Sequence, residues 1–222
     1  MDSATVLERL REMGTEQNRK VYPRQGLGND VLGVSFANIG KLRKAIKKDQ
    51  AVADELWETG IFEPQTLACM VADVAAFDEA KVERWAREAS SHGVADEVAK
   101  QIAVKTPWAL TLAREWIASQ NPLLQRAGWT SYALLAMSDE VPDKELASAI
   151  EVIEHEIHRS ENRTKEGMNN ALIAIGGSRA TLRNAAVAAA ERIGKVEVDH
   201  GQTNCKTPFA VPYIEKMWAR RG

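Results

Sequence analysis

The sequence is poor in several features that mark particular classes of protein. Its 222 residues include two cysteines, Cys69 and Cys205, which are too few for a disulfide framework, so we expect a reducing, cytoplasmic compartment. No stretch of about 18 residues is apolar and free of charge, and this excludes a membrane-spanning helix. The first residues lack a basic segment followed by an apolar run, so we expect no signal peptide.

The chain also lacks a phosphate-binding loop of the dinucleotide or P-loop type. Gly26, Gly28 and Gly33 resemble part of such a loop, but no strand precedes them, and this context excludes a Rossmann site. A structural zinc site needs four ligands, and His200 and Cys205 have no matching pair elsewhere in the sequence. We therefore expect no metal and no cofactor.

Net charge is only −2, but the charges are segregated along the chain. Residues 19–48 carry +7, residues 159–222 carry +5, and residues 139–158 between them carry −6. Segregation of this kind is typical of a protein with an anion-binding face. The alternative for the run KLRKAIKK is a solvated helix face.

Helical periodicity runs through almost the whole sequence, and no hairpin signal is present. The stripe formed by Leu146, Ile150, Ile153 and Ile157 is one example. Prolines and glycines separate the helical segments. The pattern predicts an all-α protein with helices near 3–13, 36–48, 50–59, 64–76, 79–90, 94–104, 108–119, 122–137, 143–158, 163–175, 179–193 and 208–219.

Three successive pairs of these helices resemble one another. Each pair is a helix, a short turn and a second helix, and the second helices begin near Val94, Pro122 and Arg163. Repeats of this kind predict a HEAT-like α-α superhelix, a curved solenoid of antiparallel helix pairs, with a helical bundle as the alternative. We expect a single domain over residues 1–222, with basic N-terminal helices (1–48), stacked pairs (49–193) and a polar loop followed by a last helix (194–222).

The second helices of such a solenoid line its concave wall. Asp96, Arg126 and Lys165 lie at matching places near the starts of these helices, so we expect them to face one groove. A basic groove containing one carboxylate suits a polyanion. The basic side chains would hold its phosphates, while a cationic group lies against the carboxylate. The alternative is that Arg126 and Asp96 pair with each other or cap helices.

At these residues the sequence resembles the DNA alkylation repair family of HEAT-like repeat DNA glycosylases (the AlkD-like proteins). The resemblance covers roughly residues 20 to 193 and is most specific around the turn between the second pair of helices. Three stretches carry it: Val31-Leu32-Gly33-Val34-Ser35 leading into Ile39-Gly40-Lys41-Leu42-Arg43-Lys44, then Ser91-His92-Gly93-Val94-Ala95-Asp96, and Trp116-Ile117-Ala118-Ser119-Gln120-Asn121-Pro122-Leu123-Leu124-Gln125-Arg126-Ala127.

The resemblance implies a monomer that binds double-stranded, alkylated DNA and releases 3-methyladenine or 7-methylguanine without a metal. It implies that Asp96 stabilises the positive sugar as the glycosidic bond breaks, and that Arg126 contacts the DNA backbone. Further DNA contacts are expected from Lys41, Lys44, Lys165 and Lys206. The alternative function is a non-catalytic HEAT-like scaffold that binds DNA or a protein partner.

The sequence departs from the family where aromatic rings surround the lesion. His92 precedes Asp96 where the family has tryptophan, and Asn169 occupies a second aromatic place. Cation–π contacts are worth about 0.5–2 kcal/mol, so their loss predicts slow excision. His92, Trp129 and Asn169 are the candidate lesion contacts. The polar loop over 198–208 has three interpretations: a plain connector, a DNA contact through Lys206, or a Cys205 nucleophile with His200 as base.

Overall fold

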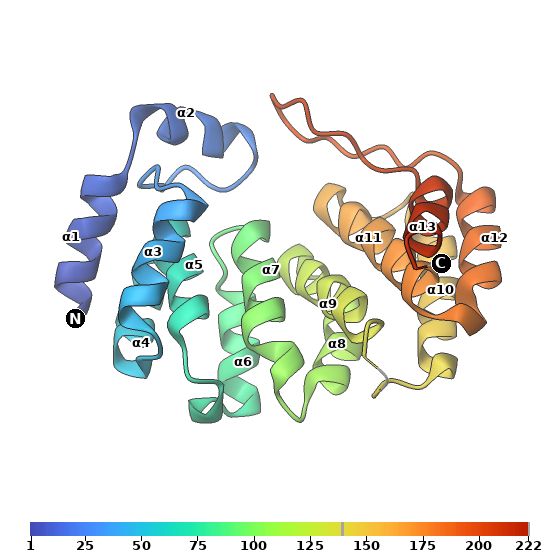
Figure 1. Cartoon of the computed structure of the whole chain (residues 1–222), viewed down its shortest axis with the longest axis horizontal. Coiled ribbons are helices and arrows are strands. Elements are labelled where there is room, and N and C mark those ends of the chain that lie inside the picture. The colour runs from blue at the N-terminus through green and yellow to red at the C-terminus, as the bar shows by residue number, and fades with distance from the viewer. Residues whose placement is uncertain (139, 222) are drawn as a thin grey trace. The chain divides into compact units, whose positions relative to one another are not determined.

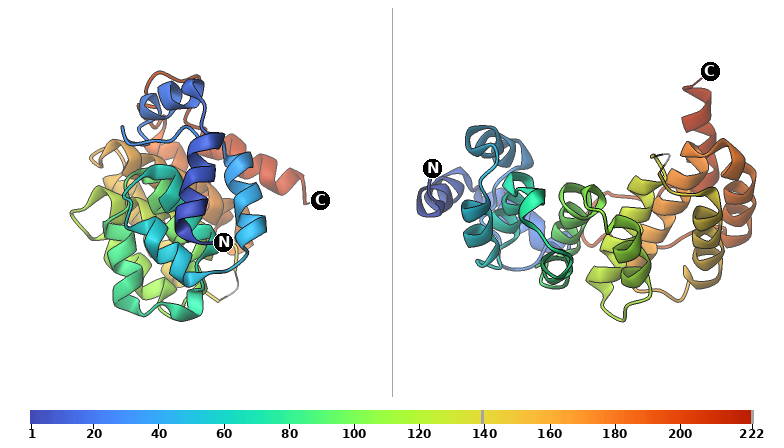
Figure 2. Two further views of the ribbon diagram at one scale, coloured as in Figure 1. Left: turned by 90° about the vertical axis from the view of Figure 1, so that its left-hand side faces the viewer. Right: turned by 90° about the horizontal axis from the view of Figure 1, so that it is seen from below.

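The structure is a computed structural model that describes residues 1–138 and 140–221. Asp139, one of the acids in the 139–158 segment, lies outside the described residues. Those residues form helices and loops and contain no strand, and the views in Figures 1 and 2 show coiled ribbons joined by loops. The prediction of an all-α protein is confirmed.

By their contacts the described residues divide into two compact units. Unit 1 contains residues 1–106 and 200–204, and unit 2 contains residues 107–138, 140–199 and 205–221. The helices of unit 1 are α1 (Ser3–Met13), α2 (Glu16–Arg24), α3 (Phe36–Ile46), α4 (Gln50–Trp57), α5 (Phe62–Val71), α6 (Glu79–Arg87) and α7 (His92–Gln101), with short 3-10 turns η1 (Val74–Ala76) and η2 (Ala103–Lys105). The helices of unit 2 are α8 (Ala109–Ile117), α9 (Pro122–Leu135), α10 (Asp143–Glu156), α11 (Asn162–Ser178), α12 (Arg183–Ile193) and α13 (Ala210–Ala219), with η3 (Ala180–Leu182).

Local capping explains where many of these helices begin. The side chain of Ser91 accepts a hydrogen bond from the Val94 backbone N–H at the start of α7. Asn121 caps α9 in the same way, with Pro122 in the first helical position, where a proline costs no hydrogen bond. The three expected helix pairs are present as α6 with α7, α8 with α9, and α10 with α11, and the members of each pair pack together.

Two parts of the helix prediction are wrong. α2 was not expected, because its polar sequence and Pro23 give a weak helical signal, yet Thr15 caps it and Pro23 stands next to its end. α11 continues through Gly176 and Gly177, which the sequence indicates as a break. A side chain at Gly176 would meet Ile214 of α13 at 2.7 Å, so the two glycines let α13 lie close against α11.

In unit 1, a buried carboxylate organises the segment that leads into α3. Glu63, near the start of α5, is fully buried. Its carboxylate accepts the backbone N–H groups of Leu32 at 2.8 Å, Gly33 at 2.6 Å and Val34 at 3.0 Å. Three such bonds replace the water that an ionised carboxylate loses on burial.

The carbonyl groups of the same segment point to α2. The Gly33 carbonyl oxygen accepts hydrogen bonds from the Thr15 backbone N–H and from the Asn18 side-chain amide. The Leu32 carbonyl oxygen accepts one from Arg19, and the Val34 carbonyl oxygen accepts one from the Tyr22 hydroxyl. Gly33 has φ 78°, and a Cβ there would lie 2.5 Å from the Thr15 carbonyl oxygen, so only glycine fits. Burial and the negative charge of Glu63 raise the pKa of the Tyr22 hydroxyl, which therefore stays protonated as a donor to Val34.

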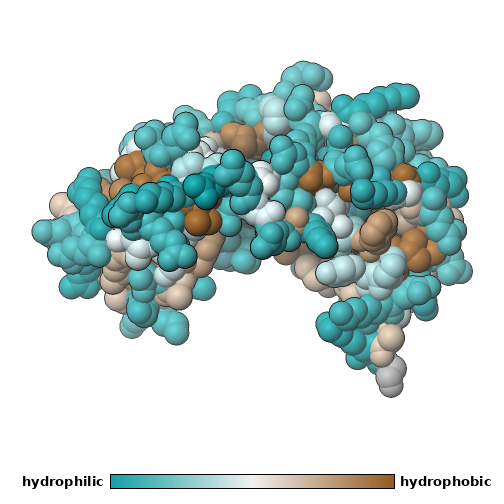
Figure 3. All heavy atoms as spheres, turned by 90° about the horizontal axis from the view of Figure 1, so that it is seen from above, coloured by the Kyte–Doolittle hydropathy of each residue, from teal (hydrophilic) through white to brown (hydrophobic). Residues whose placement is uncertain are grey.

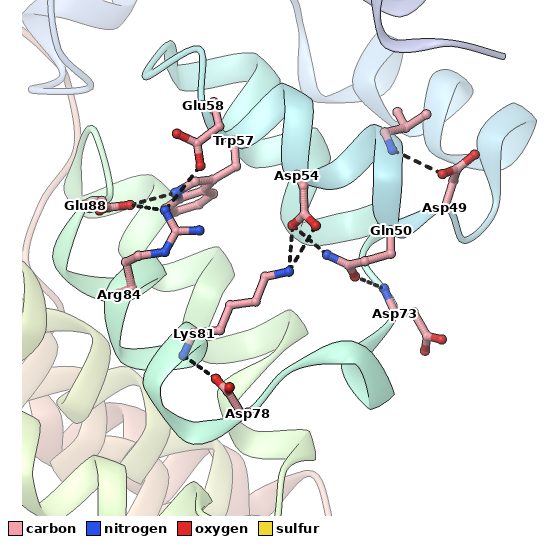
Figure 4. A network of polar contacts seen from close by, with 11 residues as sticks. Asp49, Gln50, Asp54, Trp57, Glu58, Asp73, Asp78, Lys81, Arg84 and Glu88 are labelled. Atoms are coloured by element: carbon pink, nitrogen blue, oxygen red, sulfur yellow. Dashed lines mark hydrogen bonds and ion pairs between the residues drawn. The ribbon is translucent and has the colours of Figure 1, made fainter.

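In unit 1, a network of polar contacts joins α4 to α6 (Figure 4). Trp57 of α4 and Trp85 of α6 stack with ring centroids 4.2 Å apart and planes 5° from parallel. Glu88 accepts the Trp57 indole N–H at 3.2 Å, and Lys81 pairs with Asp54 at 2.8 Å. The network therefore joins α4 to α6 at both ends of the stack.

In unit 2, small residues allow three helices to pack closely. A Cβ at Gly128 of α9 would lie 2.8 Å from Ile117 of α8, and a Cβ at Gly167 of α11 would lie 3.1 Å from Trp129 Cβ. Trp116 and Trp129 fill the resulting core. Around these cores the surface is mostly hydrophilic, with small scattered hydrophobic groups on the face shown in Figure 3.

We expect Glu63→Gln to lower the free energy of unfolding by about 2–4 kcal/mol, because the amide offers one acceptor oxygen to three N–H groups and places an NH2 among them. Urea denaturation followed by tryptophan fluorescence measures this loss. Glu83→Gln is the control, since Glu83 is more exposed and pairs only with Arg87 on its own helix; we expect a change within about 0.5 kcal/mol. Equal stability of the two variants would contradict the role of Glu63.

Candidate nucleic-acid interface

The three residues expected in the groove lie on the expected helices. Asp96 is on α7 in unit 1, while Arg126 on α9 and Lys165 on α11 are in unit 2. Asp96 and Arg126 are each the fifth residue of their helix, and the fifth residue of α11 is Glu166 rather than Lys165. The sequence alignment of the third pair is therefore displaced by one position.

Asp96 lies on a helix that has a buried apolar face. Val94, Ala95 and Val98 on the same helix are fully buried, while Asp96 itself is half-buried. His92 precedes it by one helical turn and is also half-buried. The carboxylate is therefore partly shielded from water, and its role in catalysis stays a prediction.

Arg126 is not placed as a surface contact for phosphate. Its relative exposure is 6%, and its guanidinium donates to Glu166 Oε2 and to the Arg163 carbonyl oxygen, each at 3.0 Å. Arg163 shares the same carboxylate at 3.0 Å. Within unit 2, Arg126 thus holds α9 to α11, and Glu166 is a partner that the spacing alone did not identify. The contact of Arg126 with the DNA backbone stays a prediction.

Two of the three candidate lesion contacts are also enclosed. Trp129 is fully buried and packs beside Tyr132 with ring centroids 5.7 Å apart, because α11 covers this face of α9. Asn169 is 2% exposed, and its amide donates to the Pro208 carbonyl oxygen at 3.0 Å. Both side chains are therefore committed to contacts within unit 2, and their contact with a lesion stays a prediction. His92 keeps a half-exposed position.

The loop over 198–208 is attached to α11 at two places. Asn162 donates to the Asp199 carbonyl oxygen at 2.6 Å and accepts from the Asp199 N–H at 2.7 Å, and Asn169 holds Pro208. Lys206 is exposed on this loop and Lys165 is half-buried on α11. Both lysines lie in unit 2 and remain candidate DNA contacts.

The strongest concentration of positive charge lies in unit 1. A pocket of about 500 Å³, here called the basic pocket, forms where α3, α5 and α7 end. Its floor is apolar and comes from the end of α5 and the residues that follow it. Its polar lining consists of Arg43, Lys44, Lys47, Lys48, Gln101 and Lys105.

The pocket contains no acidic lining residue. Lys48 pairs with Asp73 at its edge at 3.3 Å, and Lys105 donates to Gln101 at 3.3 Å. Arg43, Lys44 and Lys47 form no ion pair within the described part of the chain. Lys41, on the same helix, donates to Asn38 at 2.9 Å and lies outside the pocket.

Lys47 has an unusual backbone conformation. It follows the end of α3 with φ 67° and ψ −108°, the single positive φ at a non-glycine residue in the described chain. Glycine is the residue that adopts such positive-φ conformations readily, and a side chain here costs on the order of 1–3 kcal/mol. The sequence therefore keeps a lysine where the backbone favours glycine.

Across residues 1–138 and 140–221, no three histidine, cysteine or acidic side chains come together as metal ligands would. Nor does any helix of that part combine the length and the apolar character needed to cross a bilayer. Within the same part of the chain, neither the buried Cys69 nor the exposed Cys205 forms a disulfide.

Comparison with known proteins places the chain in a family. Residues 6–214 match the family described as DNA alkylation repair enzyme. The chain belongs to this family. The uncharacterised proteins Lin0241 of Listeria innocua and Lmo0209 of Listeria monocytogenes are each 30% identical over 197 residues, or 84% of this chain and 83% of theirs.

A solved structure supports the fold assignment within the DNA alkylation repair family. It is described as a new family of proteins related to the HEAT-like repeat DNA glycosylases with affinity for branched DNA structures. The match has a TM-score of 0.89 and 31% identity, and it covers 100% of this chain and 95% of the other. The predicted HEAT-like helical fold is thereby confirmed.

The sequence of this family member predicts only part of the basic pocket. The run that contains Lys44, Lys47 and Lys48 predicts a charged surface, but Lys105 stands 57 residues beyond Lys48 and carries no motif. The sequence signal for the whole pocket is the position of its lysines, because Lys47 and Lys48 follow the end of α3 and Lys105 follows the end of α7. These two helices flank α5. Knowing that α3 and α7 both pack against α5 would have identified it.

We expect Arg126→Ala to lower the free energy of unfolding by about 3 kcal/mol, because it removes a guanidinium enclosed between α9 and α11 and leaves a cavity beside Gly167. Arg159→Ala is the matched control, since that side chain is 80% exposed and its loss should cost less than about 0.5 kcal/mol. Chemical denaturation measures both. If Arg126→Ala were as stable as the control, the structural role of Arg126 would be contradicted and it would again be a candidate surface contact.

Proposed function

We propose that this protein binds DNA by its phosphate backbone, with little preference for base sequence. The observation that carries the proposal is the basic pocket of unit 1, where five cationic side chains gather without an acidic lining residue. Family membership supports it, as does the affinity for branched DNA described for the structural relative. Phosphate contacts fix position on DNA but do not read bases.

The DNA contacts that we propose come from exposed cations. Lys41 and Lys44 on α3 and Lys206 on the loop before α13 are all exposed, and lysines of this kind neutralise phosphates and release counterions. Arg126 is left out, because its guanidinium is committed to Glu166. DNA binding therefore depends on these lysines rather than on Arg126, the arginine that the family resemblance implies as a backbone contact.

We further propose that any excision of alkylated purines depends on Asp96. Its half-buried position suits a carboxylate that stabilises a developing sugar cation, since such charge is worth more where water is scarce. Trp129 is enclosed and Asn169 has no aromatic ring, so neither supplies an open aromatic face to a lesion. Excision should therefore be slow and limited to bases that already carry a positive charge, such as 3-methyladenine and 7-methylguanine.

Binding should weaken steeply as salt rises, because phosphate contacts release counterions. We expect the double variant Lys41→Gln with Lys44→Gln to weaken all duplexes alike and to reduce the log–log salt slope by about 2. Fluorescence anisotropy with duplexes of unrelated sequence, and with a branched DNA, measures both quantities. Lys144→Gln is the control, an exposed lysine of the acidic segment in unit 2 whose loss should leave the slope unchanged.

A shallow salt slope for the wild-type protein, or no binding to any DNA, would contradict the DNA-binding proposal. The alternative is then a HEAT-like scaffold for a protein partner, whose apolar interface responds weakly to salt. A double variant with the wild-type slope would remove Lys41 and Lys44 from the interface.

Base release tests the role of Asp96 separately. We expect slow release of 7-methylguanine from methylated duplex DNA by the wild-type protein, and none by Asp96→Asn, while DNA affinity and stability are retained. Chromatography of the freed bases measures release. Asp30→Asn, which changes an exposed carboxylate of unit 1, is the control. If Asp96→Asn excises as fast as wild type, the role of Asp96 is wrong even though DNA binding stands.

A further inference from the structure

The basic pocket holds more positive charge than its helix ends explain. A helix C-terminus attracts cations through its dipole, and this accounts for Arg43 and Lys44 in the last turn of α3. Lys47 and Lys48 lie beyond that helix, and Lys105 comes from η2 after α7. Three of the five cations therefore need another reason to be in the pocket.

The cations of the pocket act against one another. Burial lowers the pKa of the Lys105 ammonium, and the charges of Arg43, Lys48 and Lys100 lower it further, with Glu97 as the opposing influence. The pairing of Lys48 with Asp73 is an exposed one, and such pairs offset little of this repulsion. A bound anion would relieve the repulsion.

Backbone strain at Lys47 supports a functional reason for the same residue. Lysine at φ 67° is less stable than glycine would be. Strain of this kind persists where the side chain has a role that outweighs its cost, and it is concentrated at binding and catalytic sites. The charge of Lys47 lines the pocket, which is the place where that role would be exercised.

The floor of the pocket is held in place by the polar network of Figure 4. The side chain of Gln50 accepts the Asp73 backbone N–H at 2.9 Å and donates to Asp54 at 2.8 Å. The Asp49 N–H donates to the Val71 carbonyl oxygen at 2.9 Å. The segment between α5 and η1 is thereby fixed before any ligand arrives, which lowers the entropy lost on binding.

The size and lining of the pocket indicate the kind of anion. About 500 Å³ is within the usual range for sites that take a small molecule or one residue of a polymer. Several cations lining one pocket suit a dianion with three acceptor oxygens, which describes a phosphate monoester at neutral pH. A backbone diester carries a single charge. The apolar floor beside the cations suits the sugar or base of the same nucleotide.

We propose that the basic pocket binds a phosphate monoester, the group found at the end of a DNA strand or on a free nucleotide. The strand-end source rests on the proposed function, and it gives a DNA-binding protein of this family a means of recognising a broken strand. The exposed cations in and beside the pocket, such as Lys44 and Lys41, would still contact internal phosphates of the same DNA.

Matched oligonucleotide duplexes test the proposal, one with 5′-phosphate and 3′-phosphate ends and one with hydroxyl ends. We expect the wild-type protein to bind the phosphorylated duplex about tenfold more tightly, the gain from one additional set of charge-assisted hydrogen bonds. Lys105→Gln and Lys47→Gly should each reduce that preference by about threefold or more, and Lys144→Gln should keep it. Thermal unfolding should show Lys47→Gly to be at least as stable as wild type, because glycine relieves the strain.

The outcomes separate this proposal from DNA binding itself. Tight binding of both duplexes with no preference for phosphate ends would overturn the phosphate-monoester site and leave DNA binding intact. A titration with deoxynucleoside monophosphate followed by calorimetry provides the second arm. Binding of the monophosphate by wild type but not by Lys105→Gln, without binding to any DNA, would support the pocket with a free nucleotide as its source and would refute the proposed function.

Discussion

The buried carboxylate of Glu63 is the contact on which the N-terminal part of the protein depends. It gathers the N–H groups of residues 32–34, while α2 takes their carbonyl groups. Because this segment leads directly into Ser35, the cap of α3, its position determines where α3 begins against α5. The basic pocket lies at the other end of α3. The uncharged residues 32–34 therefore control where the positive charge of the pocket is presented.

Charge in this protein is placed by two different means. In unit 1, cations such as Lys81 and Arg84 are matched to neighbouring carboxylates, and their contribution is to hold α4 against α6. At the ends of α3 and α7 the cations gather without acidic lining residues. Cations that are paired with carboxylates stabilise the fold and have their charge balanced within the protein. A cluster of unbalanced cations instead attracts an external anion.

Much of the fold was predictable because its signals are local. Asn121 followed by Pro122 marks the start of α9, and Ser91 marks the start of α7, since a cap needs only the residues within its own turn. The helix pairs follow from periodicity in the same way. α2 and the continuation of α11 through Gly176 were not predictable, because they depend on distant residues: the carbonyls of residues 32–34 support α2, and Ile214 of α13 fills the space at Gly176.

The candidate site shows the same limit more sharply. Asp96, Arg126 and Glu166 take the same place in three successive second helices, and their charges alone suggest a groove that alternates in sign. In unit 2 the neighbouring helices α9 and α11 pack so closely at Gly167 that Arg126 and Glu166 meet, and a residue type expected to hold DNA holds a helix instead. Which charges remain available to a ligand is decided by how near the next helix lies, and a single sequence records that distance only through the small residues, such as Gly167, that permit it.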